Sequence, residues 1–195
     1  MAARLPAPRR RRQLLDVALA VFGEAGYHEA SMDSVAEAAG VTKPVLYQHF
    51  GSKRELYLEL LDDVGTRLLD EVINATKAVT HPHEQVEAGF AAYFRFVSAH
   101  TNGFRLLFGG GLYADAEFAV VAERVEEAMA ETIAELIDVD IALEHRRVLA
   151  HGVVGLAEGT SRFWVSQGLQ LDPDRLAGQV AGLAWAGLRG VRPDA

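Results

Sequence analysis

Apolar residues recur at intervals of three and four positions along most of the chain. Between residues 55 and 78 they fall at every fourth position, at Leu56, Leu60, Val64, Leu68 and Val72. This spacing places apolar side chains on one face of a helix and predicts a long amphipathic helix. Similar patterns predict helices over 9–22, 84–100, 104–108, 115–137, 141–167 and 174–189. Strand-like alternation of apolar and polar residues is absent from the sequence, which therefore predicts an all-α fold.

A different pattern starts at Ser31, where two short helices flank a tight turn. The Ser31 side chain can cap the first helix by accepting a backbone N–H of its first turn. Gly40 lies where a helix end favours a positive φ. Thr42 can cap a second helix over 43–50, and Ser52 can cap the long helix after it.

The second short helix has an inner and an outer face. Leu46 and Phe50 are four residues apart and are expected to pack inward. The outer positions are Lys43, Val45, Tyr47, Gln48 and His49. Two helices joined in this way form the helix-turn-helix, whose second helix enters the major groove of DNA.

The same segment also resembles one protein family. The run AGVTKPVLYQHFGSKREL resembles the recognition-helix segment of the TetR family of transcriptional regulators. The matching positions are Leu46, Tyr47, Phe50, Ser52 and Lys53. Pro44 departs from the family pattern, in which many members carry glycine or another small residue. The resemblance implies a three-helix helix-turn-helix DNA-binding domain over 1–52 and a helical effector-binding and dimerisation domain over 53–195.

The distribution of charge is compatible with DNA binding, although the net charge is −8. Residues 1–60 carry eight Lys or Arg and seven Asp or Glu, whereas residues 61–195 carry eleven and twenty. Phosphate contacts act within a Debye length of about 10 Å, so a basic segment can bind DNA beside an acidic body. Residues 1–8, with two prolines, are expected to form a mobile arm. This arm leads into four consecutive arginines: Arg9, Arg10, Arg11 and Arg12.

The chemistry of the outer residues assigns them to phosphates or to bases. Hydroxyl, phenol, imidazole and ammonium groups suit phosphates, and these are carried by Thr42, Tyr47, His49 and Lys53. The side chains expected at base edges are Lys43, Val45 and Gln48. Lys53 lies in the first turn of a helix, where the helix dipole disfavours a cation, so an external anion explains it better than helix stability does. The alternatives are a solvated arginine run without DNA contacts and a Tyr47 that only packs against the first short helix.

The C-terminal two-thirds of the chain contains candidates for an effector site. Its aromatic residues include Tyr93, Phe94, Phe104, Phe108, Phe118, Phe163 and Trp164, with polar groups available on His100, Arg105, His151 and Arg162. As a set they predict a small apolar or aromatic effector with few polar contacts, although each aromatic alone is also suited to ordinary core. The glycine triplet 109–111 is expected to be mobile. It lacks the lysine and the strand of a phosphate-binding loop, so nucleotide binding is not expected.

The last two predicted helices contain glycines at unusual density. Glycine inside a helix costs about 0.5–1 kcal/mol relative to alanine, so a close approach of another helix is the natural explanation. The TetR resemblance implies that these helices form a homodimer. The interface candidates are Gly152, Leu156, Gly159, Val180, Leu183, Ala184 and Gly187.

Composition removes several other classes of function. The absence of cysteine excludes disulfides, thiol catalysis and cysteine-ligated metal centres. His81 and His83 form a pair without a third ligand nearby, and no nucleophile motif is present, so neither a metal site, a cofactor nor an enzyme is expected. No apolar run approaches the roughly 18 residues of a membrane helix. A cytoplasmic protein that does not enter the membrane is expected.

Together these observations predict a ligand-responsive transcriptional regulator. It is expected to bind a pseudo-palindromic double-stranded DNA operator as a homodimer and, following the family default, to act as a repressor that a small apolar effector releases. The alternative is a ligand-independent helix-turn-helix protein that organises DNA or binds other proteins.

Overall fold

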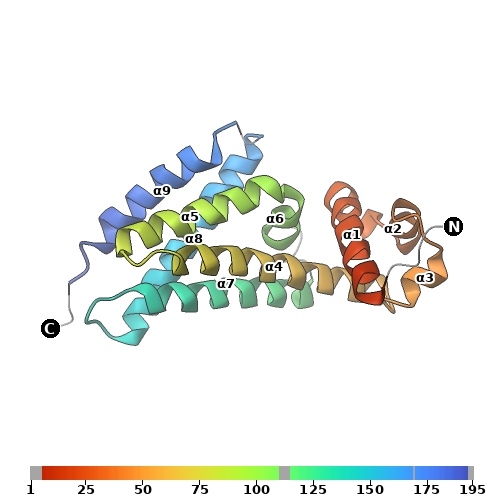
Figure 1. Cartoon of the computed structure of the whole chain (residues 1–195), viewed down its shortest axis with the longest axis horizontal. Helices are drawn as coiled ribbons and strands as arrows, with labels where there is room; N and C mark the ends of the chain where they lie inside the picture. The colour runs from red at the N-terminus through yellow and green to blue at the C-terminus, as the bar shows by residue number, and fades with distance from the viewer. Residues whose placement is uncertain (1–5, 110–114, 169, 193–195) are drawn as a thin grey trace.

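The computed structural model describes residues 6–109, 115–168 and 170–192, and within these ranges the chain forms nine α-helices and no strand (Figure 1). The all-α prediction is confirmed. The helices are α1 (Ala7–Glu29), α2 (Met32–Ala38), α3 (Lys43–Tyr47), α4 (Lys53–Lys77), α5 (Pro82–Ala99), α6 (Thr101–Phe108), α7 (Ala116–Leu136), α8 (Leu143–Ser166) and α9 (Pro173–Leu188).

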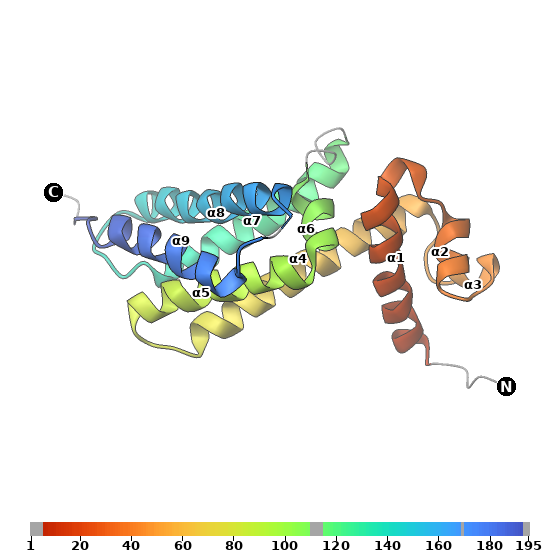
Figure 2. The ribbon, with the colours of Figure 1, turned by 90° about the horizontal axis from the view of Figure 1, so that it is seen from above.

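The first three helices form a unit at one end of an elongated molecule, and α4 leads from this unit into the helical body (Figure 2). Leu14, Phe22, Leu46, Phe50 and Leu56 are completely buried in this unit. The inward packing predicted for Leu46 and Phe50 is therefore confirmed. Because α4 continues into the body, its apolar face joins the core of the N-terminal unit to the core of the body.

The N-terminal arm is shorter than predicted, because α1 already starts at Ala7, with Pro8 in its first turn. Proline is tolerated there because the first-turn N–H groups have no intrahelical partner. Residues 1–5 of the predicted arm lie outside the described residues. The same helix also extends beyond its predicted end, through a kink at Gly26 with a φ of 77°, as far as Glu29.

Local signals set the ends of the helix-turn-helix. The Ser31 side chain accepts the N–H of Ser34, and the Ser34 side chain accepts the N–H of Ser31, so the two serines form a reciprocal cap. Gly40 has a φ of 63°, and Ser52 caps α4 by accepting the N–H of Glu55, as predicted. Thr42 occupies the N-cap position of α3 but its side chain makes no capping hydrogen bond.

The second helix of the motif ends earlier than predicted, at Tyr47 instead of Phe50. The N–H of His49 bonds the carbonyl of Leu46, three residues back, which tightens the chain after α3 into a turn. The Phe50 N–H still reaches the Leu46 carbonyl at 3.0 Å. The turn therefore carries Phe50 into the core without continuing the helix.

The body consists of α4 to α9. Helix α5 packs against α4 and α9, while α7 packs against α4 and α8. The break predicted between the helices over 84–100 and 104–108 lies at His100, and Asn102 and Gly103 belong to α6. Of the glycine triplet, Gly109 follows α6 in extended conformation, and residues 110 and 111 lie outside the described part of the chain.

Candidate nucleic-acid interface and ligand cavity

Helix α3 presents polar side chains on the outer surface of the N-terminal unit. Thr42, Lys43 and Gln48 are exposed, and Tyr47 has 42% of its surface exposed. Val45 is half-buried. The structure therefore brings the predicted base-contacting residues, and Thr42, Tyr47 and His49 of the phosphate-contacting ones, together on α3 and its two ends, while Lys53 starts α4. The individual DNA contacts stay predictions.

Lys43 is held by an acidic neighbour on α2. Its Nζ lies 2.9 Å from a carboxylate oxygen of Asp33, and both side chains are more than half exposed. The hydrogen bond that Lys43 donates to Asp33 raises the pKa of Lys43 above its ordinary value, so the ammonium stays charged. A DNA base or phosphate that binds Lys43 must therefore compete with Asp33.

Lys53 has an internal partner that sequence analysis did not identify. The kink of α1 brings Tyr27 and His28 beside the start of α4. The Lys53 Nζ donates to the His28 carbonyl at 3.1 Å and lies 4.6 Å from the centre of the Tyr27 ring. These contacts explain the first-turn lysine without an external anion. An ammonium has three donors, so Lys53 can also bind a phosphate.

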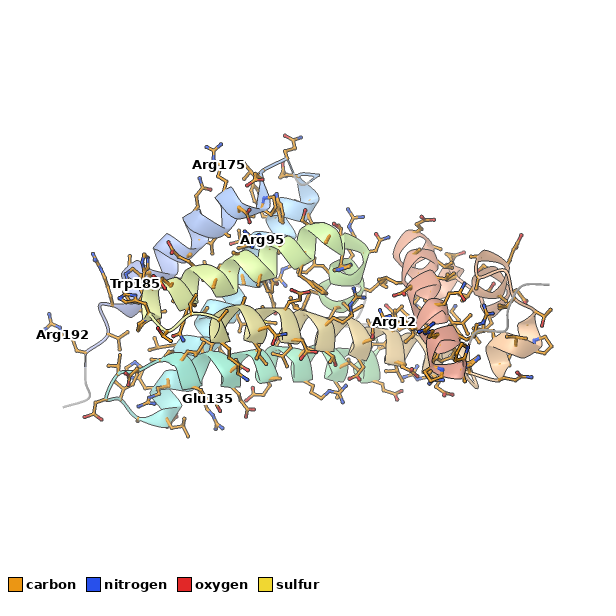
Figure 3. All side chains as sticks on the ribbon, viewed as in Figure 1. Arg12, Arg95, Glu135, Arg175, Trp185 and Arg192 are labelled. Atoms are coloured by element: carbon orange, nitrogen blue, oxygen red, sulfur yellow. The ribbon has the colours of Figure 1, made fainter. Side chains whose placement is uncertain are left out.

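Two of the four consecutive arginines join α1 to α4. Arg11 donates to both carboxylate oxygens of Glu59 and to the carbonyl of His49, and its guanidinium lies 4.4 Å from the centre of the Phe50 ring. Arg12 pairs with Asp16 at 2.7 Å and with Asp63 on α4 (Figure 3). Both side chains therefore bind residues of α4 and do not belong to a free arm.

The remaining two arginines of the run are less engaged. Arg10 donates to Gln13 at 2.7 Å and is half-buried, and Arg9 is exposed. His49 is also half-buried, and its backbone carbonyl is bound by Arg11. Of this group, Arg9 therefore presents the most accessible positive charge beside the helix-turn-helix.

The body contains a cavity of about 280 Å³ between α4, α5, α7, α8 and α9. Its walls are mainly apolar, with contributions from Val72, Val86, Phe90, Met129, Ile133, Val153, Val154, Ala157 and Leu188. Polar groups enter from Thr76, Gln85, Tyr93, Thr132, Asp138 and Arg189. Trp185 lies at the end of the body farthest from α3 (Figure 3) and also lines the cavity. An apolar cavity with a few polar groups is the usual form of a small-molecule site.

Of the aromatic residues predicted for the effector site, Tyr93 lines this cavity. Phe94 and Trp164 pack edge to face at 5.9 Å between ring centres and form ordinary core. Phe104 and Phe108 form a buried pair on α6. Phe118 packs against Tyr27 and Tyr57, where the N-terminal unit meets the body. Phe163 lies at the surface with 63% of its area exposed.

Three of the four predicted polar groups of the effector site have partners elsewhere in the chain. His100 lies 3.1 Å from Arg67, and His151 lies 3.2 Å from Glu127. Arg162 is 3.4 Å from Glu158, and Arg105 is exposed on α6. None of the four lines the cavity described above. The cavity residues at the end of α9 did not follow from the sequence, because they stand among glycines whose density equally suits a dimer interface.

The outer surface of α8 and α9 carries unusual apolar exposure. Val148, Phe163 and Leu183 have 65%, 63% and 64% of their surfaces exposed. A Cβ added to a glycine inside either helix would meet no other atom within 4 Å, apart from its neighbours along the same helix. These glycines are Gly152, Gly155, Gly159, Gly178, Gly182 and Gly187. No helix of the same chain therefore packs closely against these glycines.

The predicted dimer residues divide into two groups. Gly152, Gly159, Leu183 and Gly187 are exposed on the outer surface, and Leu156 is half-buried. Val180 and Ala184 are buried within the chain, with 7% and 8% of their surfaces exposed. They lie on the inward face of α9, so the structure does not offer these two to a partner.

The described residues form neither a metal-binding cluster nor a membrane-spanning helix. No group of three or more acidic, histidine or cysteine side chains is arranged to hold a metal ion there. His83, one of the predicted histidine pair, instead lies 4.9 Å from Trp185, ring centre to ring centre. No helix in the described ranges combines the length and the hydropathy needed to cross a membrane.

Comparisons with known proteins agree with this architecture. The family profile "Bacterial regulatory proteins, tetR family" matches residues 14–60, and the profile "Tetracyclin repressor-like, C-terminal domain" matches residues 82–187. The HTH-type transcriptional activator FasR of Mycolicibacterium smegmatis is 37% identical over 190 residues, which cover 96% of this chain and 87% of that protein.

Two further relatives extend the comparison. The HTH-type transcriptional repressor KstR2 of Mycobacterium tuberculosis is 32% identical over 91 residues, which cover 47% of this chain and 46% of that protein. The crystal structure of a TetR-like transcriptional regulator from Rhodococcus sp. RHA1 matches with a TM-score of 0.79 and 29% identity, covering 96% of this chain and all of that one. The chain therefore belongs to the TetR family and is a DNA-binding transcriptional regulator, not an enzyme.

Proposed function

We propose that this protein is a homodimeric, effector-responsive regulator that acts on cytoplasmic DNA. Two recognition helices bind the halves of a pseudo-palindromic operator, and a small apolar molecule in the body cavity changes the affinity for that operator. The observation that carries this proposal is the course of α4. This helix starts directly after the helix-turn-helix and supplies Val72 and Thr76 to the cavity wall.

Helix α4 gives the cavity a mechanical connection to DNA. Leu56 packs in the N-terminal unit, and Val72 lies sixteen residues further along the same helix, roughly 24 Å at 1.5 Å per residue. A ligand that separates α4 from α5 or α7 moves this helix and with it the spacing of two recognition helices. The loss of DNA affinity is limited by how much more tightly the ligand binds the displaced conformation than the DNA-binding one.

The surface of α8 and α9 supports the dimer. A two-fold dimer is required to read a pseudo-palindrome, because each helix-turn-helix contacts only one half-site. The exposed Phe163 and Leu183, together with glycines that have open space above them, form an apolar surface that a second copy can approach closely.

A mobility-shift experiment tests the proposal. The DNA upstream of the protein's own gene is expected to shift at nanomolar protein, with complexes that contain two chains, and a compound from an apolar panel is expected to release it. Binding that no compound alters would instead favour the alternative, a ligand-independent protein that organises DNA. The similar proteins include an activator and a repressor, so the predicted repressor role stays a prediction, which a promoter fusion with and without the regulator would test.

A further inference from the structure

A cluster of buried polar groups lies between α5, α7 and α8. The exposed fractions of Tyr93, Glu158 and Ser161 are 3%, 7% and 0%. The Tyr93 hydroxyl, the Glu158 Oε1 and the Ser161 hydroxyl have no hydrogen-bond partner among the described residues. Buried polar atoms without partners are destabilising and rare in native proteins. Three such atoms in one place leave hydrogen-bond capacity unused.

The cluster adjoins the inner end of the cavity. Tyr93 is the last cavity-lining residue along α5, and Ala157, which directly precedes Glu158, is the last along α8. On α7, Met129 is the lining residue nearest the N-terminal unit, and Glu126 lies one turn beyond it. All three helices therefore place the cluster at the end of the cavity nearer the N-terminal unit.

The Tyr93 side chain connects the cavity to the cluster. Its ring belongs to the cavity wall, while burial and the nearby Glu158 raise the pKa of its hydroxyl, which also faces Ser161. Neither hydroxyl reaches the other with hydrogen-bond geometry. Each hydroxyl can donate one hydrogen bond and accept others, and a carboxylate oxygen can accept. The unused capacity of the cluster is therefore mainly for accepting hydrogen bonds from a ligand.

The charges in the cluster restrict the kind of ligand. Glu158 has one guanidinium partner, Arg162 at 3.4 Å, and the Glu126 carboxyl lies beside it. Burial, reinforced by Glu126, raises the pKa of Glu158 to about 7. When both carboxyl groups are ionised, which for Glu158 requires a pH above about 7, they share a single cation and repel an additional anion. They accept a hydroxyl or an ammonium group, which donates hydrogen bonds and adds no negative charge.

We propose that Tyr93, Glu158 and Ser161 form a polar subsite that binds the hydrogen-bond-donating end, a hydroxyl or ammonium group, of an otherwise apolar effector. The effector enters with this end first, and its apolar part fills the cavity. This inference rests on the proposed function, because it assigns the cavity to the effector.

Calorimetric titration of the full-length protein at pH 8, where Glu158 is ionised, with 1-octanol, octylamine and octanoate tests the subsite. Octanol and octylamine are expected to bind at least about fivefold more tightly than octanoate. A fivefold difference in affinity corresponds to about one hydrogen bond. The variants Tyr93→Phe and Ser161→Ala are expected to lower the affinity for octanol about fivefold and to leave that for octanoate unchanged. Thr101→Val is the matched control, because this hydroxyl lies outside the cavity lining and already donates to the Val97 carbonyl at 3.1 Å.

Thermal unfolding without ligand provides a second measurement. Tyr93→Phe and Ser161→Ala each remove a hydroxyl without a partner, so both are expected to unfold at the same or a higher temperature than the wild type. A lower unfolding temperature for both would mean that the hydroxyls stabilise the protein through internal bonds, and it would overturn the proposal. Equal affinities for the three compounds, or no measurable binding of octanol, would overturn it as well.

A mobility shift with the same compounds separates this inference from the proposed function. If octanol binds and requires Tyr93 and Ser161 but leaves DNA affinity unchanged, the subsite stands and the effector role of the cavity fails. If another compound releases DNA and neither variant changes its effect or the affinity for octanol, the proposed function stands and the subsite is wrong.

Discussion

At the scale of single residues, the ion pair between Lys43 and Asp33 sets up a competition for the recognition lysine. An exposed pair of this kind adds little to stability, so losing it costs little. Asp33→Asn is therefore expected to fold normally and to bind the operator about two- to fivefold more tightly, with a salt slope steeper by about one. The measurement is a binding isotherm at several salt concentrations. Glu37→Gln, which removes an exposed acid from the same helix, is the control, and an equal gain in both variants would show a general charge effect only.

Lys53 is expected to affect both stability and DNA binding. Lys53→Ala removes the bond to the His28 carbonyl and the contact with the Tyr27 ring, which should lower the free energy of unfolding by about 1 kcal/mol. It should also weaken binding to all DNA sequences alike and flatten the salt slope by about one. Chemical denaturation and competition with unrelated DNA measure the two effects. A changed base preference would contradict the phosphate role of Lys53.

Glu158 makes stability depend on pH. Burial, reinforced by Glu126, raises the pKa of Glu158 from 4.5 to about 7, so the folded state binds a proton more tightly than the unfolded state. Stability from this group is complete below about pH 4.5 and is lost as the pH rises to about 7, with a loss on the order of 2 kcal/mol. Glu158→Gln should abolish this dependence and be more stable than the wild type at pH 8. Denaturation midpoints at pH 5, 6, 7 and 8 test this, and parallel pH profiles would refute it.

At the scale of helices, the sequence predicted where helices form but not where two helices cross closely at a glycine. The predicted ranges 9–22 and 104–108 leave Gly23 and Gly103 just outside the helices, yet both lie inside helices. A side chain at Gly23 would come within 2.5 Å of Asn102, and one at Gly103 within 3.0 Å of Val64. Both glycines allow two helices to cross closely. Apolar spacing is a local property and predicted the helices, whereas a crossing depends on a distant partner that the sequence does not name.

Helix α4 depends on such a crossing with α7. A side chain added at Gly65 would overlap Val125, so Gly65→Ala must push the two helices apart. This change is expected to cost about 1–3 kcal/mol of stability, despite the better helix propensity of alanine. Adding Val125→Ala should recover part of the loss, and a double-mutant cycle measured by denaturation gives the coupling. Additive effects would show that α4 and α7 do not press on each other at this point.

At the scale of the whole molecule, the two sites differ in how far the sequence predicted them. The recognition helix is formed by neighbouring residues, so Leu46, Phe50 and the exposed positions between them followed from spacing. The cavity is formed where five helices converge, and its wall includes Trp185 and Arg189 from the far end of the chain. Large apolar residues suit a core and a cavity equally well, which is why Phe94 and Trp164 became core while Tyr93 reached the cavity.

The proposed dimer determines whether one helix-turn-helix or two bind the operator. On α8, Val148, Gly152, Gly155, Gly159 and Phe163 follow one another at intervals of three and four, so they form one stripe along the helix. Phe163→Glu places a charge within this stripe and should produce monomers in light scattering. Operator affinity should fall about a hundredfold or more, because the second half-site is no longer bound from the same complex.

Val120→Glu provides the matched control for this variant. Val120 lies on α7 with 58% of its surface exposed, and the substitution adds the same charge outside α8 and α9. It should leave the dimer and the operator affinity intact. Phe163 is itself exposed in the single chain, so its replacement should not lower the stability of the monomer core, and circular dichroism can verify that the helices remain. A Phe163→Glu variant that still elutes as a dimer would locate the interface away from this stripe, and the spacing of the two recognition helices would then have to come from another surface.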